Sequence, residues 1–263
     1  MDARRISIGF FVCLFLSLGC NDIPLGHERE HEFSEIEDCF MEPDGIYRPV
    51  PFWVWNTRVT RDDIDRMLED FKEQGYGGGF VHPRPGMETP YLSEEWFDLW
   101  EYSLRKAEEL GLKLWIYDEN SYPSGFAGGH VQTEFPESYD HPSELKPVIV
   151  DRLPEDMSPY CLCLRQEGDT FDDITSQPRT DEEGRYFLYK EIYPEKQRWL
   201  GGFAYVDLLY PGTTEKFIEV TMRGYEERFG ADLASSANGV FTDEPHWHRW
   251  TPAMFDEFEK DWG

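Results

Sequence analysis

The stretch LKLWIYDENSYPSGFAGG, residues 112–129, shows the pattern on which the predicted fold depends. Its first part, LKLWIY, is a short apolar run that is typical of a β-strand. Two acids, Asp118 and Glu119, follow directly, and a loop rich in glycine and proline begins after them. The stretch therefore predicts a strand that ends in polar groups, at the position where α/β proteins carry their functional residues.

The same pattern recurs along the chain. Three other segments predict strands: PFWVWN (51–56), GGGFVHP (77–83) and GVFTDEP (239–245). Helical periodicity lies between them, with Thr60 and Ser93 as the predicted N-caps of two helices. A further helix is predicted over 213–229, and another from Thr251, with Pro252 in its first turn.

Between residues 131 and 200 the alternation of strands and helices stops. The segments KPVIVDRL, PYCLCLRQ and RYFLYKEIYP indicate antiparallel strands separated by turn residues. We interpret this region as a β-rich insertion. The predicted organisation is a signal peptide (1–20), a polar tether (21–45), barrel units one to three (46–130), the insertion (131–200) and barrel unit four (201–263).

Alternation of strands and helices predicts a parallel sheet covered by helices. Two arrangements have this pattern, the (β/α)8 barrel and the open doubly wound sheet. No glycine-rich dinucleotide loop follows the first strand, which favours the barrel. Because only about four strand–helix units are present where a closed barrel has eight, we expect a partial (β/α)8 TIM-type barrel and a chain truncated relative to its full protein.

The N-terminus, MDARRISIGFFVCLFLSLGC, has the layout of a secretory signal. Arg4 and Arg5 precede an apolar run that is too short for a membrane-spanning helix. Cys20 follows the small residue Gly19, as in bacterial lipoprotein signals, in which the cysteine carries the lipid. We therefore expect export to the periplasm or the cell surface, with a lipid anchor at Cys20 or, alternatively, an unlipidated secreted chain.

The chain of 263 residues has a formal charge of −28, from 53 acidic and 25 basic side chains. Such a balance argues against nucleic acid as a partner, because a phosphate backbone needs a cationic face. It also argues against docking on anionic lipid headgroups. An acidic chain can be disordered, but 9 Trp, 14 Tyr and 19 Phe indicate a folded, aromatic-rich core.

Two pairs of adjacent acids follow predicted strands, Asp118–Glu119 and Asp243–Glu244. Glycoside cleavage needs two carboxyl groups, one to protonate the leaving oxygen and one to act as nucleophile or to activate water. We predict Glu244 as the proton donor, because a neighbouring carboxylate and nearby tryptophans favour a protonated carboxyl group. The alternative is that the aspartates cap the loops after them, but two such pairs beside aromatic residues favour the catalytic interpretation.

Aromatic and polar side chains near these strand ends suit a sugar ring, whose C–H face packs on tryptophan and tyrosine. The predicted substrate-binding residues are Trp53, Trp55, Asn56, His82, Arg84, Asp118, Glu119, Tyr122, His246 and Trp247. The period of a strand directs Trp53 and Trp55 to one side and Val54 to the other. Packing in the core is the alternative role for about half of these aromatic residues.

No metal site is predicted. His82, His246 and His248 lack the spacing of a metal-binding helix, so we expect them to hydrogen-bond sugar hydroxyls or to pack. Cys161 and Cys163 have no second pair of metal-ligand type nearby and are interpreted as structural or free thiols.

At these residues the chain resembles a known family. The segments PFWVWN, GGGFVHPRPG, TPYLSEEWFDLW, LKLWIYDENSYPSGFAGG and FTDEP are similar to the N-terminal part of the catalytic barrel in glycoside hydrolases related to family 106, the α-L-rhamnosidases. The resemblance covers residues 46–130 and 200–250. It implies an exported, inverting, calcium-assisted enzyme that removes terminal, rhamnose-like sugars from plant or algal polysaccharides.

By that likeness Glu244 is the general acid. The residues that would line the sugar pocket are His82, Arg84, Asp118 and Glu119. The second catalytic carboxylate is expected on a later strand, beyond Gly263, so we expect little turnover from this chain alone. No calcium ligand is assigned. Two alternatives stay open: a non-catalytic carbohydrate-binding surface protein, and another barrel glycosidase such as a β-galactosidase.

Overall fold

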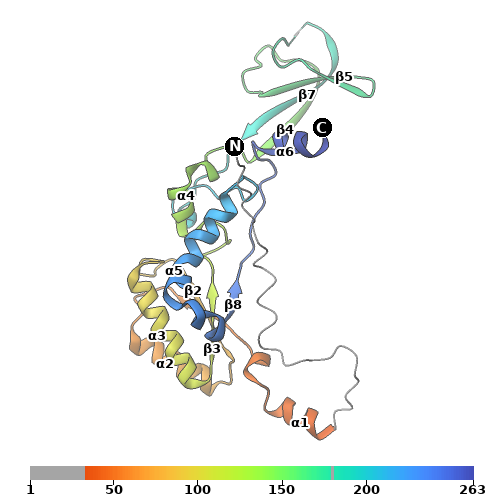
Figure 1. Ribbon diagram of the computed structural model, residues 1–263. Helices are drawn as coiled ribbons and strands as arrows, with labels where there is room; N and C mark the ends of the chain where they lie inside the picture. Colours follow the sequence, from red (N-terminus) through yellow and green to blue (C-terminus); the bar gives the residue numbers. More distant parts are fainter. Residues whose placement is uncertain (1–32, 179–180) are drawn as a thin grey trace, which may run out of the picture. The chain divides into compact units, whose positions relative to one another are not determined.

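The computed structural model describes residues 33–178 and 181–263 (Figure 1). The predicted signal peptide, Cys20 and most of the predicted tether lie outside these residues. The chain divides into two units, 1–43 and 44–263. In the described part of the first unit, helix α1 (Phe33–Met41) lies within the predicted polar tether, 21–45. Phe33, Ile36 and Phe40 recur at helical spacing there.

The second unit contains a parallel sheet of four strands in the order β1-β2-β3-β8. The strands are β1 (Phe52–Trp55), β2 (Gly78–Pro83), β3 (Lys113–Tyr117) and β8 (Ala237–Phe241). Neighbouring strands pair in parallel throughout, so the predicted parallel α/β arrangement is confirmed. Because the strands are all parallel, their carboxyl ends share one edge of the sheet.

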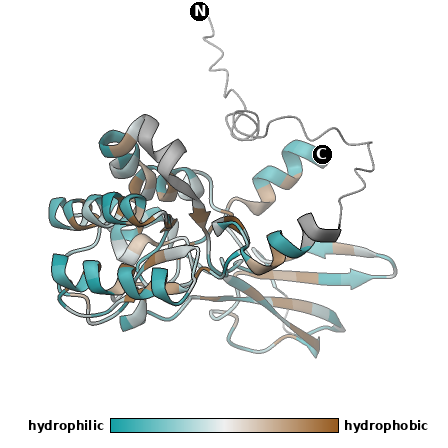
Figure 2. Ribbon diagram, turned by 90° about the horizontal axis from the view of Figure 1, so that it is seen from below, coloured by the Kyte–Doolittle hydropathy of each residue, from teal (hydrophilic) through white to brown (hydrophobic). Residues whose placement is uncertain are grey.

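The helices between these strands begin where their capping residues predict. In α2 (Arg61–Glu73), Thr60 and Asp63 form a reciprocal capping box. In α3 (Glu94–Leu110), the Ser93 side chain accepts a hydrogen bond from the Trp96 amide, and Gly111 takes the left-handed conformation that ends the helix. Hydrophilic residues cover the solvent-facing sides of these helices (Figure 2).

Helix α5 (Thr213–Ser236) precedes β8 and is interrupted at Gly230, where the sequence predicted its end. It packs closely on α3 at Gly224: a Cβ atom at this position would lie 2.1 Å from Cζ of the Phe97 ring. Only glycine therefore allows this approach of the two helices.

The main core lies between the parallel sheet and its helices. Trp53 and Trp55 are buried there, with the Trp55 ring centroid 5.3 Å from that of Trp96 on α3. The opposite face of the sheet carries a second aromatic group, in which Phe52 is 5.0 Å from Phe241 between ring centroids. Phe52 remains 43% exposed, so this face is only partly covered by the described residues.

The region after β3 forms an antiparallel sheet in the order β4-β7-β5-β6. Its strands are β4 (Glu144–Arg152), β5 (Leu162–Glu167), β6 (Thr170–Asp173) and β7 (Glu183–Ile192). Three of these were predicted, whereas β6 was missed because TFDD is short and polar. Glu144 at the start of β4 pairs with Ile192 at the end of β7.

The remaining helices are short. They are α4 (His130–Glu134), α6 (Met254–Trp262), and the 3-10 turns η1 (Gly45–Tyr47), η2 (Ala127–Gly129), η3 (Pro136–Ser138) and η4 (Arg198–Leu200). The prediction that Thr251 caps the last helix was wrong: α6 begins at Met254, after Ala253. The Thr251 carbonyl instead accepts a turn hydrogen bond from the Met254 amide.

Candidate functional site

The two predicted strand ends with paired acids meet in one hydrogen-bonded group. The Ser124 hydroxyl, in the loop after β3, donates to Oδ1 of Asp118 at 2.5 Å and accepts from the Asp243 amide at 2.8 Å. The Thr242 hydroxyl donates to the other oxygen of Asp118 at 2.6 Å. The carboxyl ends of β3 and β8 are thus joined through two aspartates and two hydroxyl groups.

Burial is the largest influence on Asp118 and raises the pKa of its carboxyl group. The hydrogen bonds from Ser124 and Thr242 act in the opposite direction, while the nearby charge of Asp243 raises the pKa further. The Asp243 carboxyl group has a different partner, the Tyr117 hydroxyl, and it is the Asp243 amide that bonds Ser124. Burial and the neighbouring charge together keep the pKa of the Asp118 carboxyl group above its ordinary value.

Tyr117 contacts both Asp243 and His82. The Tyr117 hydroxyl donates to Oδ2 of Asp243 at 2.6 Å, and the His82 ring lies 3.7 Å from the Tyr117 ring between centroids. His82 is fully buried, and neither of its ring nitrogens has a hydrogen-bond partner among the described residues. Burial, with the nearby charge of Arg84, lowers the pKa of His82 to about 3, so the ring is neutral.

Glu119 was predicted to bind substrate, but the structure gives it a different environment. The side chain is fully buried, and its two oxygens accept five backbone N–H groups, those of Asn120, Gly125, Phe126, Ala127 and Gly128, at 2.6–3.0 Å. Burial raises the pKa of Glu119 to about 8, and these donors oppose the rise. The carboxyl group holds the loop 120–128 in shape and has no oxygen left for a ligand.

Glu244, the predicted proton donor, is exposed directly after Asp243. Its backbone has φ 43°, a left-handed conformation that costs a glutamate about 1–3 kcal/mol. The tryptophans that were expected to shield it do not do so in this structure. Trp247 is 71% exposed, and Trp250 packs against Phe255 with ring centroids 4.8 Å apart.

A cavity of about 270 Å³ opens beside the ends of β2 and β3. Its lining residues include Arg84, Tyr91, Asn120, Arg198 and Trp199. The Arg84 guanidinium lies 5.1 Å from the ring centroid of Tyr122 and 5.6 Å from that of Trp199. The Trp199 indole N–H in turn donates to the Tyr122 carbonyl, which fixes the two aromatic rings around the cation.

The other predicted residues are not all in this site. Trp53 and Trp55 face the helices and belong to the core, so neither ring is available to a sugar. Asn56 is exposed after β1. His246 is exposed, and its amide donates to the Tyr205 hydroxyl at 3.2 Å.

Several members of the site were not predicted from sequence. Ser124 and Thr242 bond Asp118, and Arg198 with Trp199 comes from the region interpreted as an insertion. Only Ser124 had a local signal, its place in the glycine-rich loop after the acids. The contribution of Trp199 depends on a contact across more than seventy residues of chain.

The described residues do not offer the calcium site that the family resemblance implies. Calcium takes six to eight oxygen ligands. The group of three or more ligand residues found among the described residues consists of His141, Asp207 and His248. Two imidazoles do not fit calcium, and no step in the proposed chemistry uses that ion.

Comparison with known proteins gives one curated relative and a distant structural likeness. The chain is 27% identical over 137 residues to a protein from Formosa agariphila named "Putative beta-glucuronidase", an alignment that covers 49% of this chain and 11% of that protein. A rhamnosidase structure from Novosphingobium sp. PP1Y is 26% identical, with 45% of this chain and 12% of that chain covered and a TM-score of 0.34. No family model matches the sequence.

The chain therefore spans about a tenth of the length of the relatives that it matches. The relationship is to proteins named as glycosidases, and the fold is a mixed α/β structure with one parallel and one antiparallel sheet. Within the described ranges, none of the helices has the length and apolar character that a membrane crossing requires.

Proposed function

We propose that this chain forms the acid-bearing part of a glycoside hydrolase active site. The observation that carries the proposal is the joining of Asp118 and Asp243 through Ser124 at adjacent parallel strand ends. Glycoside cleavage needs carboxyl groups at the reacting bond. Here Asp243 and Glu244 lie at the end of β8, next to Asp118, whose carboxyl group is buried and has a raised pKa.

In this proposal Glu244 protonates the glycosidic oxygen. Its exposed carboxyl group can reach a sugar bound over the strand ends. Asp243 fixes the end of β8, because its carboxylate bonds Tyr117 and its amide bonds Ser124. The strained backbone at Glu244 supports a functional rather than a structural role, since such conformations gather at active sites.

The proposed architecture is part of a (β/α)8 TIM-type barrel. The sequential order β1-β2-β3-β8 supports it, because barrel strands follow the chain whereas a doubly wound sheet reverses direction. The aromatic face around Phe52, Phe80 and Phe241 would then be turned toward the barrel interior.

Two classes of sugar are candidates. The family resemblance favours a neutral, rhamnose-like terminal sugar from plant or algal polysaccharides. Arg84 and Arg198 beside the cavity favour instead a sugar with a carboxylate, since guanidinium groups bind carboxylates in bidentate fashion. The relative named as a glucuronidase supports this second class.

The test is a panel of aryl α-L-rhamnosides, β-D-glucuronides and β-D-galactosides, assayed with this chain and with the product of the complete reading frame. Turnover that falls at least about 100-fold in the Glu244→Gln variant supports the proposed acid. Equal turnover in the variant contradicts it. Glu73→Gln, an exposed change at the end of α2, is the matched control.

Saturable sugar binding without turnover by either product favours the alternative, a carbohydrate-binding surface protein. Turnover of the galactoside alone favours another type of barrel glycosidase. Robust hydrolysis by this chain by itself contradicts the expectation that a second carboxylate is needed from elsewhere.

Export to the periplasm or cell surface, with Cys20 as the lipid attachment point, is part of the same proposal. The arginines and the apolar run of the N-terminal segment support it. Mass spectrometry of the mature N-terminus is the test: an intact Met1 contradicts export, and an unmodified N-terminus after cleavage contradicts the lipid anchor.

A further inference from the structure

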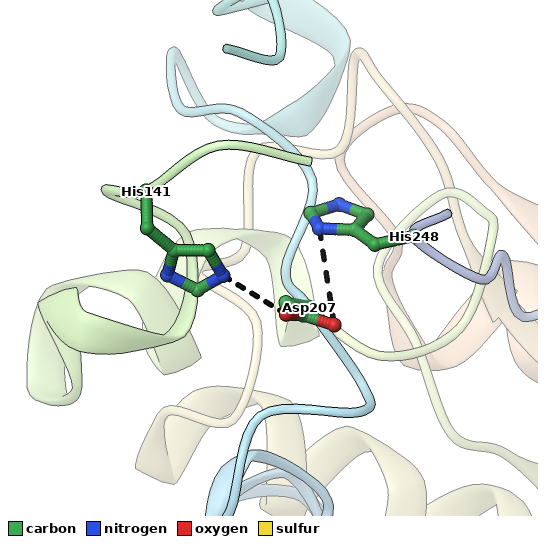
Figure 3. A group of neighbouring side chains, drawn as sticks. All are labelled: His141, Asp207 and His248. Atoms are coloured by element: carbon green, nitrogen blue, oxygen red, sulfur yellow. Dashed lines mark hydrogen bonds and ion pairs between the residues drawn. The ribbon is translucent and has the colours of Figure 1, made fainter. Parts of the chain in front are cut away.

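Two histidines distant in sequence, His141 and His248, converge on the buried carboxylate of Asp207 (Figure 3). His141 Nε2 lies 2.9 Å from Oδ2 of Asp207, and His248 Nδ1 lies 3.8 Å from Oδ1 of the same residue. The Asp207 side chain has no exposed surface, and those of His141 and His248 are 11% and 8% exposed. One ligand atom from each residue lies within 4.8 Å of the others.

The outer nitrogen of the His141 ring is already occupied. His141 Nδ1 lies 3.0 Å from the Glu137 carbonyl oxygen, which can only accept, so this nitrogen carries a proton. His248 Nδ1 is buried without a hydrogen-bond partner among the described residues. A ligating histidine typically donates its other N–H to a carbonyl, which directs a lone pair to the metal.

A proton does not satisfy this arrangement. If His141 is protonated on both nitrogens, it forms a good ion pair with Asp207 at 2.9 Å. The 3.8 Å between His248 Nδ1 and Asp207 is too long for a hydrogen bond, and the orphaned nitrogen stays buried. A cation shared by all three residues satisfies both histidines and the carboxylate together.

We propose that His141 Nε2, Asp207 and His248 Nδ1 form a zinc site. A tetrahedral zinc with bonds of about 2.0–2.2 Å spaces its ligand atoms roughly 3.3–3.5 Å apart. The spacings of 2.9 Å to Oδ2 and 3.8 Å to Oδ1 of Asp207 fall on either side of that value, and one ligand atom from each residue lies within 4.8 Å of the others. Two imidazoles and one carboxylate are ligands that zinc accepts and that calcium and magnesium do not favour.

Such an ion has a positioning role for the strand end that carries the candidate acids. His141 precedes β4, Asp207 precedes α5, and His248 lies four residues after Glu244. The backbone in the same region adds a further link, in which the Arg249 amide donates to the Ser143 carbonyl at 3.1 Å. The ion would thus tie the segment after β8 to two other parts of the second unit.

The test is calorimetric titration of zinc chloride into chelator-treated chain, purified without a histidine tag. Exposed Cys39 and Cys161 are changed to serine in every sample, because free thiols also bind zinc. One equivalent of zinc is expected to bind, and cobalt in its place should give the visible absorption of a tetrahedral site. Calcium and magnesium titrations should show no saturable binding.

The His248→Gln variant should bind zinc at least about tenfold more weakly, because even outer partners of zinc ligands change affinity by that amount. Asp207→Asn should reduce the affinity for zinc to a similar extent. Circular dichroism will show whether each variant remains folded. His130→Gln alters an exposed histidine outside the cluster and should leave the affinity unchanged. Absence of zinc binding to the parent chain, or equal affinity in folded His248→Gln, overturns the proposal.

Discussion

The Tyr117 hydroxyl at the end of β3 donates a hydrogen bond to the Asp243 carboxylate, with 2.6 Å between the two oxygens. This contact joins residues separated by 126 positions and fixes an acid at the end of β8. A hydrogen bond to a charged group contributes about 1.5–3 kcal/mol. We therefore expect Tyr117→Phe to lower the free energy of unfolding by about 2 kcal/mol, measured by urea denaturation. An unchanged midpoint would show that the contact does not stabilise the fold.

The neutral, buried state of His82 predicts a pH dependence of stability. Its folded pKa is about 3 against an ordinary value of 6.5, so below pH 6.5 the unfolded chain takes up a proton that the folded chain does not. The contribution of neutral His82 to the free energy of unfolding is therefore fully present above pH 6.5. It falls by about 1.4 kcal/mol per pH unit as the pH decreases below that value.

Urea denaturation between pH 6.5 and 5 of the parent chain and of His82→Asn measures this dependence. In the variant the free energy of unfolding should depend less steeply on pH, because asparagine does not titrate and the contribution of His82 is removed. Parallel pH profiles for the two proteins would contradict the prediction. His130→Asn, at an exposed site, serves as the control and should keep the parent slope.

Replacement of Glu119 by glutamine tests the loop-holding role of its carboxyl group. The new amide would direct an NH2 group at backbone N–H donors that now bind an oxygen. We expect the free energy of unfolding to fall by at least about 3 kcal/mol, since buried donors are left without acceptors. Glu73→Gln should change stability by less than about 0.5 kcal/mol. A similar small effect at Glu119 would contradict the role.

The close approach of α5 to α3 predicts that Gly224→Ala is destabilising. The added Cβ would overlap the Phe97 ring, and overpacking of this kind costs about 1–3 kcal/mol. Gly45→Ala is the control, because a Cβ there meets no atom within 4 Å. Thermal unfolding should show a lower midpoint for the first variant only; equal midpoints would mean that the helices separate without cost.

The cation held between Tyr122 and Trp199 predicts a preference for acidic sugars. Arg84→Lys retains the charge but loses the planar group that binds a carboxylate through two hydrogen bonds. We expect glucuronate to bind at least about tenfold more weakly to this variant, with rhamnose unaffected. Tryptophan fluorescence titration measures both sugars, with Arg58→Lys, an exposed change, as the control. Weaker binding of both sugars alike would argue against carboxylate recognition.

The parallel sheet was predictable because its signals are local. Apolar runs, the capping residues Thr60 and Ser93, and acids directly after strands each lie within a few residues of the feature that they determine. The strand-end acids Asp118 and Asp243 lie close together for the same reason, since parallel strands end at a common edge.

The sides on which side chains lie were harder to predict. Alternation correctly placed Trp53 and Trp55 on one face of β1, but both faces of this sheet carry aromatic residues. Nothing local distinguishes the face covered by helices from the other. Glu119 was assigned to a pocket from its place at a strand end and from the family resemblance, whereas its loop folds back over it.

The proposed zinc site of His141, Asp207 and His248 could not be predicted from sequence, because His141 and Asp207 lie 66 positions apart and neither belongs to a motif. Their contact depends on the path of the chain through the antiparallel sheet. The sequence around His248 lacks the spacing of a metal-binding helix, which gave no reason to expect a ligand there.

The pairing of Glu144 with Ile192 has a consequence for how this protein can change over evolutionary time. The chain enters the antiparallel sheet and leaves it at two neighbouring positions, which lie about 5 Å apart because they belong to paired strands. A gene segment that encodes it can be lost, gained or exchanged while the two flanking ends still meet. Relatives that share the parallel strands are therefore free to carry accessory modules of very different size at this point.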